Sequence, residues 1–206
     1  MRAHIVTNLF APDELAGAAL FTDLALFLKE RGHDVRVTCT FSYYPAWKLR
    51  PEDEGLALRE ESYEGIPVRR VRMYVPGNPT GKERLLSDLR FLLSLVRRGR
   101  FPGWEPEVVL TAFPMLSQCL AQRFLYRGKR SPRLIVVQDF VVEAALELGI
   151  GCARLLHGLQ RWALRSAQTL LHEMSIRAAR RSGLYHHDRI LTVYEQELVK
   201  LTGNVK

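Results

Sequence analysis

Residues 3–40 read AHIVTNLFAPDELAGAALFTDLALFLKERGHDVRVTCT, and this stretch decides the fold class. Its apolar pattern predicts a short strand over Ala3–Thr7, a helix over Ala18–Arg31 and a second strand over Asp34–Thr40. The loop Asn8–Gly17 connects the first strand to the helix. In an α/β protein with this order, the loop after the first strand borders the ligand crevice, so we expect function to show there first.

The rest of the chain repeats this alternation of strands and helices. Further strands are expected over Leu58–Tyr63, Ile66–Val75, Glu107–Thr111, Arg133–Gln138 and His187–Val193, and further helices over Lys82–Arg98, Pro114–Tyr126, Cys152 towards Arg181, and Tyr194–Leu201. The predicted fold is therefore α/β, a Rossmann-like parallel sheet with helices on both faces. As domains, we expect 1–193 to form this unit and 194–206 to begin a linker or helix.

Two of the expected helices have apolar residues at the helical period. In Ala18–Arg31 the apolar face should pack on the sheet, and it consists of Leu20, Phe21, Leu24, Phe27 and Leu28. In Lys82–Arg98 the pattern predicts an amphipathic helix whose apolar positions are Leu85, Leu86, Leu89, Leu92, Leu93 and Val96.

The chain has a formal net charge of +8 over 206 residues, and its basic residues are unevenly placed. They cluster at Arg97–Arg100, Arg123–Arg133 and Arg154–Arg181. Such clusters can mean solvated helix faces, an anionic membrane surface or nucleic acid. No aromatic-interleaved basic stripe or known nucleic-acid motif is present in the sequence, so we expect no nucleic-acid partner.

The cysteines and the N-terminus indicate a reducing compartment. Cys39, Cys119 and Cys152 lie far apart without a CxxC motif, which favours buried free thiols over a disulfide scaffold or a zinc site. Asp13 and Glu14 interrupt the N-terminus before the apolar region of a signal peptide could form. No run reaches the roughly 18 apolar residues of a transmembrane helix. We expect a soluble or peripheral protein without a metal.

The sharpest candidate for chemistry follows the expected strand Arg133–Gln138. Asp139, Glu143 and Glu147 are spaced by four, so a helix starting near Asp139 would carry these carboxylates on one face. They could hydrogen-bond sugar hydroxyls or act as a general base towards an attacking hydroxyl. They could equally complement the dipole of a first helical turn. The spacing leaves both interpretations open.

Two loops carry weaker signals. Asn8–Gly17 lacks the GxGxxG fingerprint, so NAD or FAD binding is not expected. Gly17 at a helix start could admit an anion or hydroxyl to exposed backbone N–H groups, or form only a tight turn. Tyr43, Tyr44 and Trp47 could stack on a sugar ring, dip into a lipid interface or cover the sheet edge.

Taken in order, several motifs resemble the N-terminal domain of retaining glycosyltransferases of family 4, particularly the colanic-acid and exopolysaccharide biosynthesis branch. The matching stretches are Asn8–Gly17 (NLFAPDELAG), Gly32–Val37 (GHDVRV), Tyr43–Trp47 (YYPAW), Tyr63–Val68 (YEGIPV), Pro106–Val109 (PEVV) and Gln138–Gly149 (QDFVVEAALELG). The likeness covers residues 1–150 well and the rest loosely. Where relatives tend to carry a serine early in the motif after the last strand, this chain reads Thr192-Val193-Tyr194-Glu195.

This resemblance implies two facing Rossmann-like domains, the arrangement called GT-B. The N-terminal domain binds the acceptor, often a lipid-linked saccharide at the cytoplasmic membrane face, and a C-terminal domain binds the nucleotide-sugar donor through paired glutamates. By resemblance Asp139 is the catalytic candidate, and the acceptor-side candidates are Pro12, Glu14, Gly17, Gln138 and Glu143. No cofactor or metal is implied, because the nucleotide-sugar is a substrate.

Two functions are therefore expected from the sequence. The first is the acceptor-binding half of a glycosyltransferase, whose donor-binding residues would lie in a domain beyond Lys206. We expect residues 1–206 alone to transfer sugar poorly, because catalysis needs donor and acceptor held together. The alternative is a non-catalytic module that docks an anionic membrane or a separate donor-domain chain. Either would be cytoplasmic, or peripheral on the inner face of the membrane.

Overall fold

The computed structural model describes residues 1–13, 15–77, 80–113, 115–126, 131–137, 158, 168–170 and 187–203. Within these residues the strands are β1 (Arg2–Val6), β2 (Asp34–Thr40), β3 (Leu58–Tyr63), β4 (Ile66–Val71), β5 (Val108–Phe113), β6 (Arg133–Val137) and β7 (Gln168–Leu170). The helices are α1 (Ala16–Glu30), α2 (Gly81–Arg98), α3 (Leu116–Leu125) and α7 (His187–Gly203), with a short 3-10 helix, η1 (Pro51–Asp53).

The described strands form one seven-stranded sheet in the order β3-β4-β2-β1-β5-β6-β7. Neighbouring strands are parallel except for β3 and β4, which form an antiparallel hairpin at one edge. The predicted fold class is confirmed. The strand order reverses between β1 and β5, and ligands of open α/β sheets bind beside the carboxyl ends of the strands at such a point.

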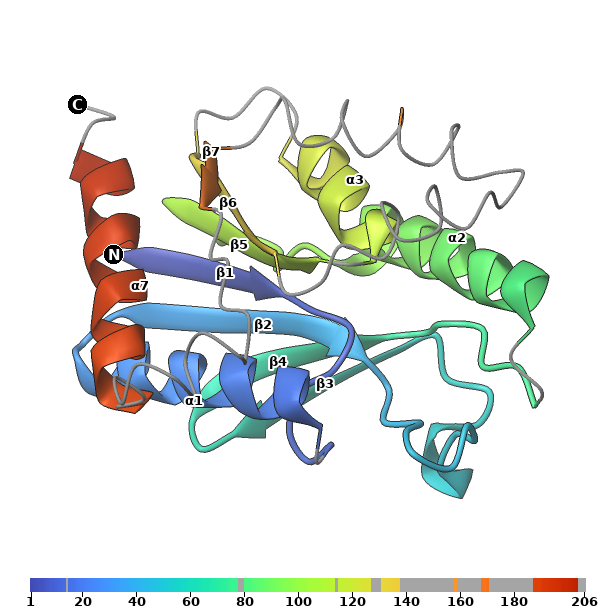
Figure 1. The fold of residues 1–206 in the computed structure, drawn as a ribbon. Helices are drawn as coiled ribbons and strands as arrows, with labels where there is room; N and C mark the ends of the chain where they lie inside the picture. The colour runs from blue at the N-terminus through green and yellow to red at the C-terminus, as the bar shows by residue number, and fades with distance from the viewer. Residues whose placement is uncertain are drawn as a thin grey trace, which may run out of the picture.

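Helices cover both faces of the sheet (Figure 1). Because side chains alternate along a strand, β1 sends Ala3 and Ile5 to one face and Val6 to the other. The first two belong to the core that includes residues of α1 and α7, such as Leu28 and Leu198. Val6 belongs to the core that includes residues of α2 and α3. This layering places the crevice loops at one end of a rigid, two-sided core.

Helix α1 begins at Ala16, one residue before Gly17, and its buried positions recur at the helical period. Phe21, Leu24 and Leu28 are almost fully buried against the sheet, as the apolar pattern predicted. The helix ends before Gly32, whose φ of +81° lies in the left-handed region that favours glycine. Strand β2 then begins at Asp34, so the predicted strand–helix–strand order is confirmed.

Helix α2 is where the sequence pattern and the packing differ. A capping box fixes its first turn. The backbone N–H of Glu83 donates to the Thr80 hydroxyl oxygen, and the backbone N–H of Thr80 donates to the Glu83 carboxylate at 3.1 Å. The residues buried beneath it are Ser87, Phe91 and Leu95. The apolar positions singled out from the sequence are mostly exposed, with Leu85 and Leu89 about half exposed.

Two predictions from the C-terminal part of the chain were wrong. The expected strand His187–Val193 is helical and continues into the expected helix as α7, with Leu191, Tyr194 and Leu198 buried in the core. A short apolar run does not distinguish a strand from a buried helical segment. The residues 168–170 lie in the expected long helix but form β7, which pairs in parallel with β6. The domain division at 193–194 falls inside α7 and stays a prediction.

Candidate functional site

The candidate site lies where the loops after β1 and β2 meet at the carboxyl ends of these strands. Arg70 of β4 joins the two loops from beneath, and its side chain is only 1% exposed. Its guanidinium donates to the backbone carbonyl of Ala11 and to that of Thr40, the latter at 3.2 Å. It also pairs with Glu61 of β3 at 2.6 Å. A single buried arginine therefore fixes the loop after β1 against the end of β2.

The carboxylate of Asp13 forms the second link between these loops. Its Oδ1 accepts a hydrogen bond from the Ser42 hydroxyl at 2.8 Å, while its Oδ2 is buried without a partner among the described residues. Burial raises the pKa of Asp13, against the opposing effects of the Ser42 hydrogen bond and the Arg70 charge. A buried carboxylate oxygen without a donor is suited to accept a hydrogen bond from a ligand hydroxyl.

A pocket of about 250 Å³ lies between the two loops. It is lined by Pro12, Asp13, Ser42, Tyr43, Tyr44, Pro45, Ala46, Lys48 and Arg50. Tyr43 is 8% exposed and belongs to the core, whereas Tyr44 is 38% exposed. Trp47 packs edge-on against both tyrosine rings, at 5.6 and 6.4 Å between centroids. The two tyrosines of this loop therefore differ: Tyr43 packs on the sheet, and Tyr44 is exposed at the pocket.

The opposite side of the switch point, at the end of β5, is polar and buried. Gln118 of α3 is fully buried, and its amide donates to the side-chain oxygen of Asn8 at 3.2 Å. Asp88 of α2 accepts the backbone N–H of Ser117 with both carboxylate oxygens at 3.2 Å. Burial raises the pKa of Asp88. Because Asp88 lies 29 residues before Ser117, no local capping motif in the sequence signals this contact.

Of the site residues predicted from the sequence, one lines the pocket, one lies outside it, and the others are not among the described residues. Pro12 is exposed and lines the pocket together with Tyr44. Gly17 lies in the first turn of α1 and is half-buried, but it is not among the pocket-lining residues. Thr111, the last residue of the expected strand Glu107–Thr111, is buried, and its hydroxyl oxygen accepts a hydrogen bond from the Gln122 amide at 2.6 Å. Glu14, Gln138, Asp139, Glu143 and Glu147 lie outside the described residues.

The sequence missed the residues that build the site. Arg70 lies in a strand and contacts the loop after β1, and Asp88 lies in α2 and contacts the first turn of α3; both partners are far away along the chain. The sequence offers no local signal for such contacts beyond the acidic pair Glu60-Glu61 and the basic pair Arg69-Arg70 in the β3–β4 hairpin. The sequence pattern marks Asp13 only as a charge that would interrupt a signal peptide, and it does not indicate the contact of Asp13 with Ser42.

The described residues also bear on thiols, metals and membranes. Cys39 and Cys119 are buried free thiols as predicted, and burial raises the pKa of each to about 12. Cys152 lies outside the described residues. Across the described ranges, His, Cys, Asp and Glu side chains form no group of three or more that could hold a metal ion. None of the helices described there has both the length and the apolar character needed to cross a membrane.

Comparison with known families decides the identity of this fold. The family model of the glycosyl transferase 4-like domain matches residues 17–198. The chain belongs to this family. It is 31% identical over 143 residues to WcaI of Escherichia coli strain K12, a protein named for glycosyl transfer in colanic acid biosynthesis. The match covers 66% of this chain and 34% of WcaI, so the chain spans about a third of the length of that relative.

Two solved structures align with this chain at low sequence identity. Sucrose-phosphate synthase from Thermosynechococcus elongatus aligns with a TM-score of 0.54 at 12% identity, over 81% of this chain and 41% of that one. The catalytic domain of starch synthase IV from Arabidopsis thaliana aligns with a TM-score of 0.46 at 15% identity, over 68% of this chain and 34% of that one. The fold matches the N-terminal half of GT-B glycosyltransferases, as the sequence resemblance implied.

Proposed function

We propose that this glycosyl transferase 4-like chain is the acceptor-binding part of a retaining glycosyltransferase. The whole enzyme would move a sugar from a nucleotide-sugar donor to a lipid-linked saccharide during exopolysaccharide synthesis. The observation that carries this proposal is the pocket formed by Pro12, Asp13 and Tyr44 at the carboxyl ends of β1 and β2. The family membership and the name of the relative WcaI support the reaction class.

The pocket offers the chemistry that a saccharide needs. The exposed ring of Tyr44 can pack on the apolar face of a sugar, and the unpartnered Oδ2 of Asp13 can accept a sugar hydroxyl. Lys48 and Arg50 add positive charge at the rim, which suits a negatively charged group that links the saccharide to its lipid. A volume of about 250 Å³ lies just below the range typical of small-molecule pockets, which suits a small ligand such as a single sugar ring.

The catalytic part of the proposal rests on the family resemblance. Asp139 is proposed to stand beside the reacting sugar, with Gln138 and Glu143 contacting the acceptor, and Glu14 and Gly17 on the facing loop. The donor would be held by a second domain, and neither a metal nor another cofactor is part of the proposal. A direct test of Asp139 is its substitution by Asn in the whole enzyme, with turnover and acceptor binding measured separately.

The acceptor site can be tested by saturation-transfer NMR of residues 1–206 with a panel of mono- and disaccharides. Tyr44→Ala should weaken saccharide binding about two- to twelvefold, because an aromatic contact contributes about 0.5–1.5 kcal/mol. Tyr74→Ala is the matched control, since Tyr74 is also 38% exposed but lies outside the pocket. No saturation transfer with any saccharide, or equal weakening by both variants, would show that this pocket is not the acceptor site.

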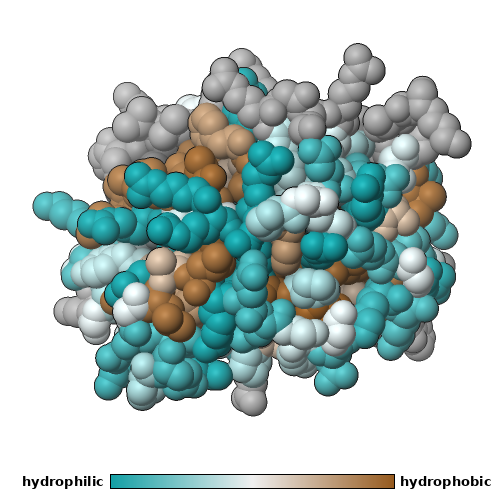
Figure 2. All heavy atoms as spheres, turned by 180° about the vertical axis from the view of Figure 1, so that it is seen from behind, coloured by the Kyte–Doolittle hydropathy of each residue, from teal (hydrophilic) through white to brown (hydrophobic). Residues whose placement is uncertain are grey.

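The outer face of α2 favours a second function, docking to an anionic membrane. Five large apolar side chains of this helix are exposed, from 39% to 51%: Leu85, Leu86, Leu89, Leu93 and Val96. We call these five residues the α2 stripe. Basic side chains of the same helix accompany it, and Figure 2 shows apolar patches interleaved with hydrophilic side chains on the side of the molecule where α2 lies. An apolar face flanked by Lys and Arg is typical of helices that lie on membrane surfaces.

Membrane docking can be tested by sedimentation with vesicles of phosphatidylglycerol and phosphatidylcholine. Leu89→Gln with Leu93→Gln should weaken binding at least about tenfold, because burial of each leucine contributes on the order of 1 kcal/mol or more. The control is Leu56→Gln with Val199→Gln, two exposed apolar residues on other elements. If the α2 variant sediments like the unchanged protein, or if the control loses as much, the α2 stripe is not a docking surface.

A further inference from the structure

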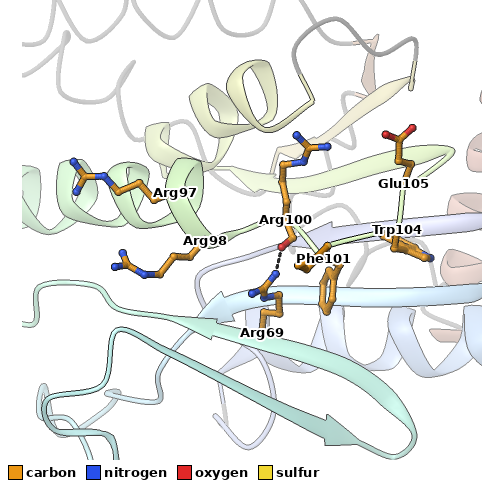
Figure 3. Close-up of a pocket in the computed structure, with 9 residues that line it drawn as sticks. Arg69, Arg97, Arg98, Arg100, Phe101, Trp104 and Glu105 are labelled. Atoms are coloured by element: carbon orange, nitrogen blue, oxygen red, sulfur yellow. Dashed lines mark hydrogen bonds between the residues drawn. The ribbon is translucent and has the colours of Figure 1, made fainter.

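A second and larger pocket, of about 510 Å³, lies beside the C-terminal end of α2. The loop before β5 forms one wall, and this loop reaches the start of β1, where the Glu107 N–H donates to the Arg2 carbonyl at 2.7 Å. This larger pocket therefore lies towards the amino ends of the strands, away from the proposed acceptor pocket at Pro12 and Tyr44. Three separate segments supply its arginines: Arg69 of β4, Arg97 and Arg98 of α2, and Arg100 of the loop (Figure 3).

The loop wall is held in place by buried contacts. Arg69 is 7% exposed and donates to the Arg100 carbonyl, as the dashed line in Figure 3 marks. The Thr38 hydroxyl donates to the Gly99 carbonyl at 2.9 Å. The Trp104 indole donates to Asp34 at 2.6 Å. The loop wall of the pocket is thus anchored to the sheet.

A further cation, the Arg36 guanidinium, packs against two aromatic rings of the loop. Phe101 and Trp104 pack edge to face, 5.9 Å between centroids. The Arg36 guanidinium lies 4.6 Å from the Trp104 ring and 5.3 Å from the Phe101 ring, and that of Arg69 lies 5.5 Å from Phe101. Both aromatic residues are only 7% exposed, so they support the cations and are not an open stacking platform for a ligand.

Positive charge exceeds negative charge around the pocket. Glu105 is the carboxylate among the lining residues, and Glu60 reaches in to pair with Arg69 at 3.0 Å. Arg97 and Arg98 form no ion pair with any residue that the structure describes. Arg97 and Arg98 lie in the last turn of α2, where positive charge complements the helix dipole. The dipole does not explain Arg69 of β4, whose buried Nε has no hydrogen-bond partner among the described residues.

We propose that this arginine pocket binds a phosphate-bearing anion, at a site separate from the acceptor crevice. A guanidinium presents planar, paired donors that match phosphate oxygens, and it stays charged at every physiological pH. Guanidiniums from three segments line a pocket of about 510 Å³ and can contact more than one phosphate group, which suits a diphosphate or a phospholipid headgroup better than a single small anion. The inference goes beyond the proposed function and does not depend on it.

The test compares two probes and two variants of the 206-residue chain at fixed ionic strength. Pyrophosphate is titrated by calorimetry, and vesicles containing phosphatidylglycerol are used in sedimentation. The pocket variant is Arg97→Gln with Arg98→Gln. The control, Arg72→Gln with Lys200→Gln, removes the same charge from exposed positions that lie outside both the pocket and α2. All four side chains are exposed, so both variants should fold.

The pocket variant should lose at least about tenfold in affinity, and the control less than about threefold, since charge-assisted hydrogen bonds are the stronger class. Loss of pyrophosphate binding identifies a soluble phosphate ligand, whereas loss confined to vesicles identifies a lipid headgroup. If neither probe binds, or if both variants lose alike, the pocket is not a phosphate site. Saccharide binding at Tyr44 should be unchanged in the pocket variant, which separates this inference from the acceptor proposal.

Discussion

His4 is a fully buried histidine whose environment keeps it neutral. Its Nε2 lies 2.9 Å from the Thr38 hydroxyl and its Nδ1 lies 2.8 Å from the Tyr126 hydroxyl. Burial lowers the pKa of His4 from 6.5 to about 3, with a further contribution from the charges of Arg69 and Arg36. A histidine with both nitrogens engaged and no proton to exchange near neutral pH is a packing residue rather than a catalytic one.

Acid should therefore destabilise the fold through His4. The unfolded chain binds a proton on His4 below pH 6.5, whereas the folded chain does not until about pH 3. Stability from the neutral ring is thus complete above pH 6.5 and declines as the pH falls towards 3, by up to about 1.4 kcal/mol per pH unit. Urea unfolding between pH 4 and 7.5 should show this slope in the unchanged protein and lose it in His4→Asn.

The comparison must be made as a difference between the two proteins. Asp13 and Asp88 have a pKa raised by burial, so they act in the opposite sense and favour the folded state as the pH falls. Their contribution is common to both proteins and cancels. Identical slopes in the unchanged protein and in His4→Asn would contradict the assignment of a neutral buried His4.

At the scale of the element, α2 shows that apolar periodicity does not identify the buried face by itself. Its sequence offers two apolar faces. Phe91 and Leu95 pack into the core with the neighbouring Ser87, and the α2 stripe lies on the other side of the helix. A helix with apolar residues all round is typically buried on all sides. The exposure of the α2 stripe is what makes this helix a candidate docking surface.

Paired truncations on α2 test which face is buried. Phe91→Ala should lower the free energy of unfolding by about 3–5 kcal/mol, because it removes a fully buried ring and leaves a cavity. Leu89→Ala, two positions away and 51% exposed, should change it by less than about 0.5 kcal/mol. Chemical denaturation of both variants checks the difference. Comparable losses would mean that the α2 stripe is covered in the folded protein.

At the scale of the molecule, the features of the proposed acceptor site gather at one end of the sheet. Three features lie together at the carboxyl ends of the strands: the switch point between β1 and β5, the pocket at Pro12 and Tyr44, and the buried polar residues at the start of α3. The chain covers about a third of the length of WcaI. A donor bound by a second domain would have to face this end of the sheet for sugar transfer.

We expect the 206-residue chain alone to release little nucleotide from nucleotide-sugar donors, even with an acceptor present. The reason is proximity, since positioning both reactants can supply about 7–11 kcal/mol of the barrier. A coupled assay of nucleotide release over a panel of donors measures this, with a complete two-domain glycosyltransferase as positive control. Robust turnover by residues 1–206 would contradict the acceptor-half proposal.

Local patterns predicted most elements well. The predictions agree with the structure to within a few residues at the ends of these elements: the strand–helix–strand of residues 3–40, the β3–β4 hairpin, α2, β5, α3 and β6. These elements have clear periodicity and glycine or proline boundaries. The failures, β7 and the first part of α7, are short or β-rich runs whose state depends on a neighbour: β7 on the open edge of β6, and α7 on the core beneath Leu191 and Leu198.

The candidate site divides in the same way. The amino-acid sequence by itself determined the α/β class, the position of the crevice loops and the family resemblance, because each rests on residues close together along the chain. Only the tertiary structure decided that Arg70 clamps two loops, that Asp13 meets Ser42, that Tyr44 and not Tyr43 is open, and that the α2 stripe faces outward. These depend on contacts between distant segments, whose energies are fixed only when the sheet has brought the segments together.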